Sequence, residues 1–168
     1  MENKLSTAKV YFVIGRTASG KSTVSTLLYN DLSKKNKCII IDPDDLSKYN
    51  IKPLPGDFSF QARIKRNEFL IRIISWLSEQ SEIIIVSAIG QPEECRNMWK
   101  ENFKHCTMIY LKSDLETCEK RDFKGIYKLK ENVIGKHLPF HEPLDCDIII
   151  DVNKIDAQQA KELILTKI

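Results

Sequence analysis

The stretch GRTASGKST, from Gly15 to Thr23, decides how this sequence is interpreted. It matches the pattern G-x-x-x-x-G-K-[ST], in which glycines let the backbone curl so that its N–H groups point at phosphate oxygens. The apolar run VYFVI at 10–14 precedes the loop, and an amphipathic segment at 21–33 follows it. A strand, a glycine loop and a helix in this order predict a nucleotide-phosphate site, favoured by the positive end of the helix dipole.

We expect this loop to supply phosphate contacts and one ligand of a divalent cation. The ammonium of Lys21 can reach the β- and γ-phosphates of a bound nucleotide, and the hydroxyl of Ser22 can bind Mg²⁺. The residues of the loop predicted to bind the nucleotide are Gly15, Ala18, Ser19, Gly20, Lys21, Ser22 and Thr23.

Short apolar runs alternate with segments of helical pattern along the rest of the chain. The runs suit strands buried on both faces and lie at 10–14, 38–41, 83–89, 107–111 and 147–150. Helices are expected at 21–33, 60–78, 92–103, 114–121 and 157–166, the fourth capped by Ser113. This alternation predicts an α/β, three-layer P-loop NTPase fold, with a five-stranded parallel sheet, helices on both faces and a short lid.

Length and composition indicate a single globular domain spanning residues 1–168. Hydrophobic residues make up 42% and charged residues 29%, and the net charge of +3 is too weak to indicate a nucleic-acid partner. No apolar run approaches the roughly 18 residues that span a membrane, and the start MENKLSTAK lacks a secretory signal. Five cysteines without a CxxC pair favour a reducing, cytoplasmic location without a disulfide or metal framework. Two longer irregular stretches, 47–59 and about 122–145, are expected to carry the substrate site or a lid.

An acidic turn, IDPDDL, follows the second apolar run. It places Asp42, Asp44 and Asp45 at the carboxyl end of a strand, which in this fold adjoins the phosphate loop. A carboxylate there can bind Mg²⁺, directly or through water, or accept a proton from an attacking hydroxyl. The alternative is a solvated acidic turn in which Asp44 or Asp45 caps a helix.

Two tetrads keep a GTP-binding switch protein open as an alternative. NKID at 153–156 imitates the guanine-reading NKxD, and DFKG at 122–125 imitates DxxG. DFKG follows an expected helix rather than a strand, and NKID lies close to the end of the chain. We therefore interpret NKID as a strand-to-helix turn. An inactive nucleotide-binding module is a further alternative.

The order of further motifs resembles that of the adenylylsulfate (APS) kinases, which transfer the γ-phosphate of ATP to the ribose 3′-hydroxyl of adenylyl sulfate. LETCEKRDFKGIYK at 115–128 is very close to the family's LExCExRDPKGLYK. IDPDD stands where the family has DGDN, and FSFQAR at 58–63 resembles GFSxxDR. IIIVSAIGQPEECR at 83–96 resembles a strand followed by FISPYRxxR, and HLPFHEP at 137–143 resembles PYExP. The resemblance implies ATP and Mg²⁺ as cofactors, a small nucleotide-type acceptor and a homodimer.

The resemblance also implies roles for single residues. Asp44 falls where the family has the aspartate assigned to the acceptor hydroxyl, and Asp42 lies at the strand end near Mg²⁺. Arg121 would lie by the ATP, while Lys124 and Lys128 would neutralise phosphate charge, a solvated basic loop being the alternative. The implied catalytic residues are Asp44, Lys21 and Asp42. The implied acceptor-binding residues are Asp44, Phe58, which would stack on the base, Arg63, Arg66, Ile89, Lys124, Lys128 and Val133.

Departures from the family pattern cluster in the acceptor half of the site. Ser47 replaces an arginine, Arg66 an asparagine that touches the acceptor, and Glu93 the first arginine of SPYRxxR. Gly90 replaces the serine of that motif, so no phosphoserine intermediate can form, and direct in-line transfer is expected. The second arginine of the motif is retained as Arg96.

The lid also departs from the family. KLKENVIG is shorter than the family's KKARAGEIKNFTG, and Val133 replaces the phenylalanine that closes over the acceptor adenine. Losing that aromatic face would weaken purine stacking by roughly 1–3 kcal/mol, unless Phe140 substitutes. We hypothesise an acceptor that is nucleotide-like but is not adenylyl sulfate, as in cytidine diphosphoramidate kinase, an APS-kinase-like enzyme of capsule biosynthesis that phosphorylates a ribose 3′-hydroxyl. A true adenylylsulfate kinase is the alternative.

Overall fold

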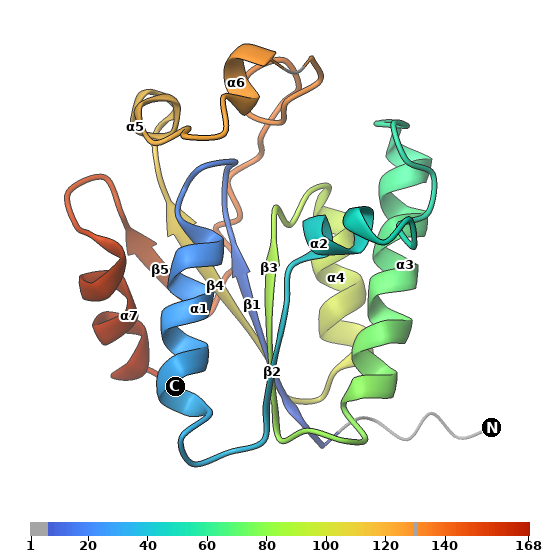
Figure 1. The fold of residues 1–168 in the computed structure, drawn as a ribbon, viewed down its shortest axis with the longest axis vertical. Coiled ribbons are helices and arrows are strands. Elements are labelled where there is room, and N and C mark those ends of the chain that lie inside the picture. The colour runs from blue at the N-terminus through green and yellow to red at the C-terminus, as the bar shows by residue number, and fades with distance from the viewer. Residues whose placement is uncertain (1–6, 130) are drawn as a thin grey trace.

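The computed structural model describes residues 7–129 and 131–168 (Figure 1). Most of the polar start and Lys130 of the expected lid lie outside the described residues. Five strands form one sheet in the order β2-β3-β1-β4-β5, and every neighbouring pair is parallel. The strands are β1 (Lys9–Ile14), β2 (Cys38–Ile41), β3 (Ile83–Ala88), β4 (Cys106–Lys112) and β5 (Ile148–Asp151). The predicted five-stranded parallel sheet is confirmed.

Helices lie on both faces of the sheet, as predicted (Figure 1). They are α1 (Lys21–Leu32), α2 (Pro43–Lys48), α3 (Phe60–Leu77), α4 (Glu93–Asn102), α5 (Leu115–Lys120), α6 (Ile126–Leu129) and α7 (Ala157–Leu165). α1 and α7 cover one face, α3 and α4 the other, and α5 and α6 lie beyond the carboxyl ends of the strands (Figure 1). None of the helices in the described part of the chain is long and apolar enough to cross a membrane.

Three details differ from the sequence expectations. α2 is absent from the list of expected helices, although a helix capped by Asp44 or Asp45 was the alternative for the acidic turn, and α6 lies inside the stretch 122–145 that was expected to be irregular. The cap of α5 is Asp114 rather than Ser113, because the Asp114 carboxylate accepts a hydrogen bond from the Thr117 amide at 2.7 Å. Ser113 is buried, and its hydroxyl contacts the Cys118 thiol instead.

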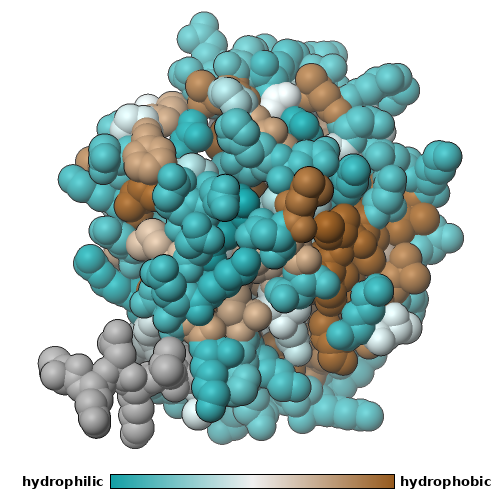
Figure 2. Space-filling view, turned by 180° about the vertical axis from the view of Figure 1, so that it is seen from behind, coloured by the Kyte–Doolittle hydropathy of each residue, from teal (hydrophilic) through white to brown (hydrophobic). Residues whose placement is uncertain are grey.

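The core has two layers because the central strand β1 is buried on both faces. Val10, Phe12 and Ile14 face the α3/α4 layer, whereas Tyr11 and Val13 face the α1/α7 layer. The ring of Phe12 stacks on Trp99 of α4 with centroids 4.0 Å apart. Seen from behind, the surface is mostly hydrophilic around an apolar area (Figure 2).

The sheet register places the candidate functional segments at one edge. Ile14 pairs with Ala88, and Ile41 pairs with Val86, so β1, β2 and β3 end close together. Each of these strands runs directly into a segment singled out in the sequence: the glycine loop, the acidic turn and the segment after β3. In open α/β sheets, ligands bind outside the carboxyl ends of the strands.

Candidate active site

The glycine loop turns sharply between β1 and α1. A Cβ on Gly15 would lie 2.8 Å from the Leu111 carbonyl oxygen and 2.8 Å from the Ser19 hydroxyl, so only glycine fits. Gly20 is the N-cap of α1, with φ of 93°, and no side chain caps the helix. The amides of the first turn are therefore left for a ligand, and the helix dipole favours an anion there.

The ammonium of Lys21 folds back over this loop. Its Nζ donates to the carbonyl of Arg16 at 2.5 Å. Burial lowers the pKa of Lys21 to about 8, and the carboxylates of Asp42 and Asp44 act in the opposite direction. Lys124 of the lid lies near enough to lower the pKa of Lys21 further. Phosphate oxygens at this position would favour the charged form of the lysine.

Ser22 and Asp42 form the contact between the loop and the acidic turn. The Ser22 hydroxyl donates to Asp42 Oδ2 at 2.6 Å, while Asp42 Oδ1 accepts from the Asp44 amide at 3.0 Å. Asp42, rather than Asp44 or Asp45, therefore caps the helix α2. The side chain of Asp44 is 80% exposed and lies 3.5 Å from the Lys52 ammonium.

This pair of oxygen donors suits Mg²⁺. Magnesium prefers oxygen ligands and is usually held by one or two protein groups together with phosphate oxygens and waters. Within residues 7–129 and 131–168, no group of three or more His, Cys, Asp and Glu side chains is placed to hold a metal. A nucleotide-bound Mg²⁺ needs only one or two ligands from the protein, and the Ser22 hydroxyl and the Asp42 carboxylate can supply them.

The acceptor half begins with the loop between α2 and α3. Arg66 donates to the carbonyl oxygens of Leu54 at 2.7 Å and of Asp57 at 2.6 Å, so its guanidinium holds this loop. The ring of Phe58, just beyond, is 47% exposed. Burial lowers the pKa of the half-buried Arg63, and the neighbouring positive charge of Arg66 lowers it further.

The segment after β3 is built around Arg96. Ile89 is half-buried at the strand end, and Gly90 takes a φ of 72° with Ile14 directly behind it. The buried guanidinium of Arg96 donates to the Gly90 carbonyl at 2.9 Å and to Asp145 Oδ1 at 3.1 Å. The arginine retained from the family pattern is thus bound within the protein.

The lid residues separate into exposed and buried ones. Lys124 and Lys128 are exposed, and Arg121 reaches the Ile155 carbonyl at 3.5 Å. Val133 is only 6% exposed and packs beneath the lid against Cys118 and Tyr127. The structure therefore brings Lys124 close enough to Lys21 to affect its charge, but it leaves Val133 buried.

The tetrad NKID has structural roles. It lies between β5 and α7, as expected of a strand-to-helix turn. Asp156 caps α7, with its carboxylate 2.8 Å from the Gln159 amide, and the Gln159 side chain returns the contact to form a capping box. Asn153 Oδ1 accepts from the Asp114 amide at 3.0 Å.

Two contacts between the glycine loop and the lid have no signal in the sequence. Arg16 lies against Gly135 and Phe140, and the Tyr127 hydroxyl donates to the Thr17 carbonyl at 2.8 Å. Arg16 and Thr17 occupy variable positions of the loop motif, so the pattern carries no signal for them.

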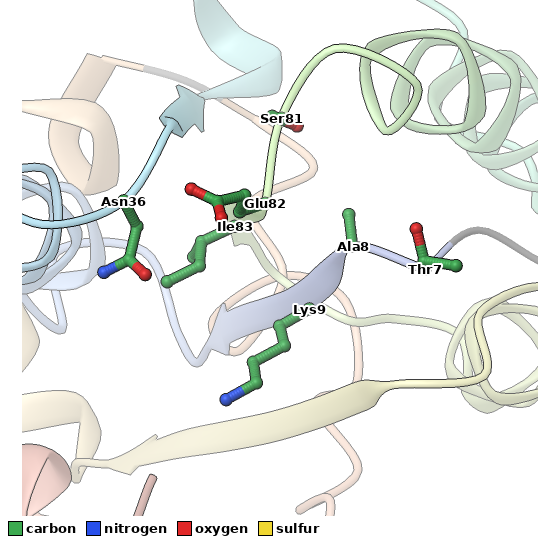
Figure 3. Close-up of a pocket in the computed structure, with 7 residues that line it drawn as sticks. All are labelled: Thr7, Ala8, Lys9, Asn36, Ser81, Glu82 and Ile83. Carbon is green, nitrogen blue, oxygen red and sulfur yellow. The ribbon is translucent and has the colours of Figure 1, made fainter.

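A hollow lies at the opposite end of the sheet from the glycine loop (Figure 3). It has a volume of about 300 Å³, and its lining includes Lys9, Asn36 and Glu82. These residues lie at the amino ends of β1 and β3 and in the turn before β2, away from the glycine loop. The hollow is therefore separate from the candidate active site.

The parallel sheet, the glycine loop running into α1, and the hydroxyl and carboxylate beside it define a P-loop kinase. The family model described as adenylylsulphate kinase matches residues 7–151, which is most of the chain. The chain belongs to the adenylylsulphate kinase family. It is therefore an ATP-binding enzyme that transfers phosphate to a hydroxyl-type acceptor.

Individual relatives carry different names within this family. The cytidine diphosphoramidate kinase of Campylobacter jejuni is 27% identical, with 95% of each chain covered. The adenylyl-sulfate kinase of Thermodesulfovibrio yellowstonii is 30% identical over 84% of this chain and 74% of its own. The solved APS kinase of Mycobacterium tuberculosis, in complex with AMPPNP and APS, shares the fold with a TM-score of 0.83 and 24% identity, covering 94% of this chain and 95% of that one.

Proposed function

We propose that this chain transfers the γ-phosphate of ATP directly to the ribose 3′-hydroxyl of a nucleotide-type acceptor. The observation that carries the proposal is the contact between Ser22 and Asp42, at 2.6 Å, beside the Lys21 ammonium and the exposed Asp44 carboxylate. Phosphoryl transfer depends mostly on positioning and on neutralising charge, and these four side chains offer both.

The donor half would act through the glycine loop. The free amides of α1 and the Lys21 ammonium bind the phosphates, and Ser22 and Asp42 would hold Mg²⁺. The cation, when bound, supplies positive charge against the phosphate oxygens. Arg121, near the turn at Ile155, would lie by the nucleotide, and Lys124 would add a further positive charge.

The acceptor half would act through Asp44. Its carboxylate is exposed at the first turn of α2, so it can accept the proton of the attacking hydroxyl. No side-chain hydroxyl stands at Gly90, so a phosphoserine cannot form there, and the transfer is direct.

The acceptor we favour is a cytidine diphosphoramidate. The Campylobacter relative bears that substrate in its name and is covered over 95% of its length. Val133 is buried and has no ring, and one face of the half-buried Phe140 ring lies against Arg16, so the lid offers a purine less aromatic surface than the family pattern does. Phe58 keeps its exposed ring for one-sided stacking on a smaller base. Adenylyl sulfate is the alternative acceptor, since the Thermodesulfovibrio relative is named for it.

A homodimer and a cytoplasmic location remain predictions from the sequence.

The test is a coupled ADP-release assay with CDP-phosphoramidate, adenylyl sulfate and plain nucleotides as acceptors. We expect the highest kcat/KM with CDP-phosphoramidate. Lys21→Met should abolish turnover, whereas Lys154→Met, which removes an exposed lysine on the turn before α7, should retain it. Strong turnover with adenylyl sulfate and none with CDP-phosphoramidate would refute this choice of acceptor.

Phe58→Ala tests the stacking contact separately. Losing a base–aromatic stack of about 1–3 kcal/mol should raise the acceptor KM roughly 5- to 150-fold. Trp76→Ala, which removes an exposed ring from the far end of α3, is the matched control and should leave that KM unchanged. An unchanged acceptor KM in Phe58→Ala would remove this residue from the site.

A further inference from the structure

The side chain of Arg16 leaves the glycine loop and contacts the chain segment 133–140, here named the acceptor turn. Its Nη1 donates to the Gly135 carbonyl at 3.2 Å. Its Cζ lies 4.4 Å from the centre of the Phe140 ring, which is cation–π distance. One guanidinium therefore contacts two residues of a segment that lies more than a hundred positions further along the chain.

The acceptor turn is shaped to receive this guanidinium. Gly135 has a φ of 92°, and a Cβ there would lie 2.5 Å from Arg16 Nη1, so a larger residue would displace the arginine. The turn is also closed by its own backbone, because the Gly135 amide donates to the Leu138 carbonyl at 2.7 Å and the His137 amide to the Val133 carbonyl at 2.9 Å. A segment closed in this way moves as a unit, so contacts at Gly135 and Phe140 position all of it.

The contact is partly shielded from water. Arg16 Nε and the Tyr110 hydroxyl are both buried, and neither has a hydrogen-bond partner in the described part of the chain. The Tyr110 ring lies beneath Phe140, with ring centroids 6.3 Å apart. Cation–π attraction is stronger where the cation is desolvated, so the arginine is well placed to hold the ring.

The next residue of the loop makes a second contact with the lid. The Tyr127 hydroxyl donates to the Thr17 carbonyl at 2.8 Å, and the Tyr127 side chain is buried. Tyr127 packs in turn against Val133, the first residue of the acceptor turn. Two successive residues of the phosphate loop thus hold the lid.

We propose that Arg16 is a positioning residue that clamps the acceptor turn onto the phosphate loop, so that the loop that binds the donor also sets the geometry of the acceptor half. The acceptor part of this inference rests on the proposed function. The clamp itself is a property of the protein without ligands. It also assigns Phe140 a role as the surface on which Arg16 rests, rather than as a ring that stacks on the acceptor base.

The first test is hydrogen exchange of the ligand-free protein. In Arg16→Ala, amide exchange within 133–140 should become at least about tenfold faster. Arg16→Lys should restore part of the protection, because an ammonium can still donate to the Gly135 carbonyl. Arg72→Ala, which removes an exposed arginine from α3, is the matched control and should exchange like the wild type. Should Arg16→Ala fail to fold, Phe140→Leu must show the same local loss of protection.

The second test separates the two substrates in steady-state kinetics. Arg16→Ala should raise the acceptor KM about tenfold and leave the ATP KM within about twofold, because Lys21 bonds to the main-chain carbonyl of Arg16, which the substitution retains. Adding Phe140→Leu to Arg16→Ala should cause little further loss, since the two side chains act through one contact. A rise of both KM values together would indicate a merely structural role.

The outcomes separate the clamp from the reaction. Unchanged exchange of the acceptor turn in Arg16→Ala overturns the clamp, whatever the kinetics show. Faster exchange in that variant, with no acceptor turned over by the wild type, supports the clamp and contradicts the proposed function.

Discussion

The Ser22 hydroxyl lies 2.6 Å from Asp42 Oδ2, which joins the first turn of α1 to the end of β2. β2 is not a neighbour of β1, because β3 lies between them in the sheet. The contact therefore joins segments that follow two non-neighbouring strands, and it brings the donor half of the site next to the acidic turn. A nucleotide-bound cation would lie beside these two oxygens.

Asp42→Asn should lower kcat on the order of 100-fold and raise the Mg²⁺ concentration needed for half-maximal rate. The amide removes the negative charge but can still cap α2 by accepting from the Asp44 amide. The measurement is a rate titration with Mg²⁺ at saturating ATP, with circular dichroism to show that the fold is kept. A magnesium dependence equal to that of the wild type would contradict this role of Asp42.

Asp44→Asn should lower kcat about 10²- to 10⁴-fold and change the ATP KM by less than about twofold, since a general base is lost but no donor contact. Asp45→Asn is the matched control, because Asp45 is its neighbour in the same turn and pairs with Lys48. Steady-state kinetics on both variants decides. Equal rates in the two variants would remove Asp44 from the mechanism.

The pKa of Lys21, lowered to about 8 by burial, predicts how stability depends on pH. Between pH 8 and the ordinary lysine value of 10.5, the unfolded chain binds more protons than the folded one. The cost of burying the charged lysine is therefore present in full below pH 8 and disappears as the pH rises towards 10.5. Lys21→Met should be more stable than the wild type at pH 7, by about 1–3 kcal/mol, with the difference shrinking by pH 10.

Urea unfolding of both proteins at pH 7 and pH 10 measures this difference directly. The other groups that titrate between pH 7 and pH 10 are the same in both proteins. Their contribution therefore cancels in the difference between the two free energies of unfolding. A stability difference that stays constant between the two pH values would show that Lys21 keeps an ordinary pKa.

Asp156→Ala separates the cap from a guanine-reading role. It should lower the free energy of unfolding by about 0.5–2 kcal/mol, because the α7 cap is lost, and leave the preference for ATP over GTP unchanged. Lys154→Ala, on the same turn, is the control for stability. Competition binding with ATP and GTP measures the nucleotide preference. A changed preference in Asp156→Ala would support the GTP-binding alternative.

The sequence predicted the strands well because their apolar runs are short, continuous and rich in Ile and Val, as buried parallel strands are. It did not decide whether the acidic turn forms the helix α2, because Pro43 and two aspartates suit a loop and a helix start equally well. The cap formed by the Asp42 side chain identifies the helix in the structure. Ser113 and Asp114 are both good caps, and the burial of Ser113 decided between them. The capping propensity of a single residue does not show which of two neighbouring residues the tertiary fold will bury.

The site shows the same division between local and distant signals. The glycine loop carries its own pattern, so its conformation was predictable from nine consecutive residues. Two contacts join residues far apart in the chain: Arg16 with Gly135, and Arg96 with Asp145. No local sequence pattern indicates either contact. Arg66 stays a predicted acceptor-binding residue, and its position in the motif gives no sign that its guanidinium donates to the Leu54 and Asp57 carbonyls.

The most direct test of the transfer itself is phosphorus-31 NMR of the reaction with ATP, Mg²⁺ and CDP-phosphoramidate. The proposed function predicts ADP and a new phosphomonoester signal that couples to the ribose H3′, absent when Lys21→Met replaces the wild type. ADP with inorganic phosphate alone, or no consumption of ATP with any nucleotide acceptor, would contradict it.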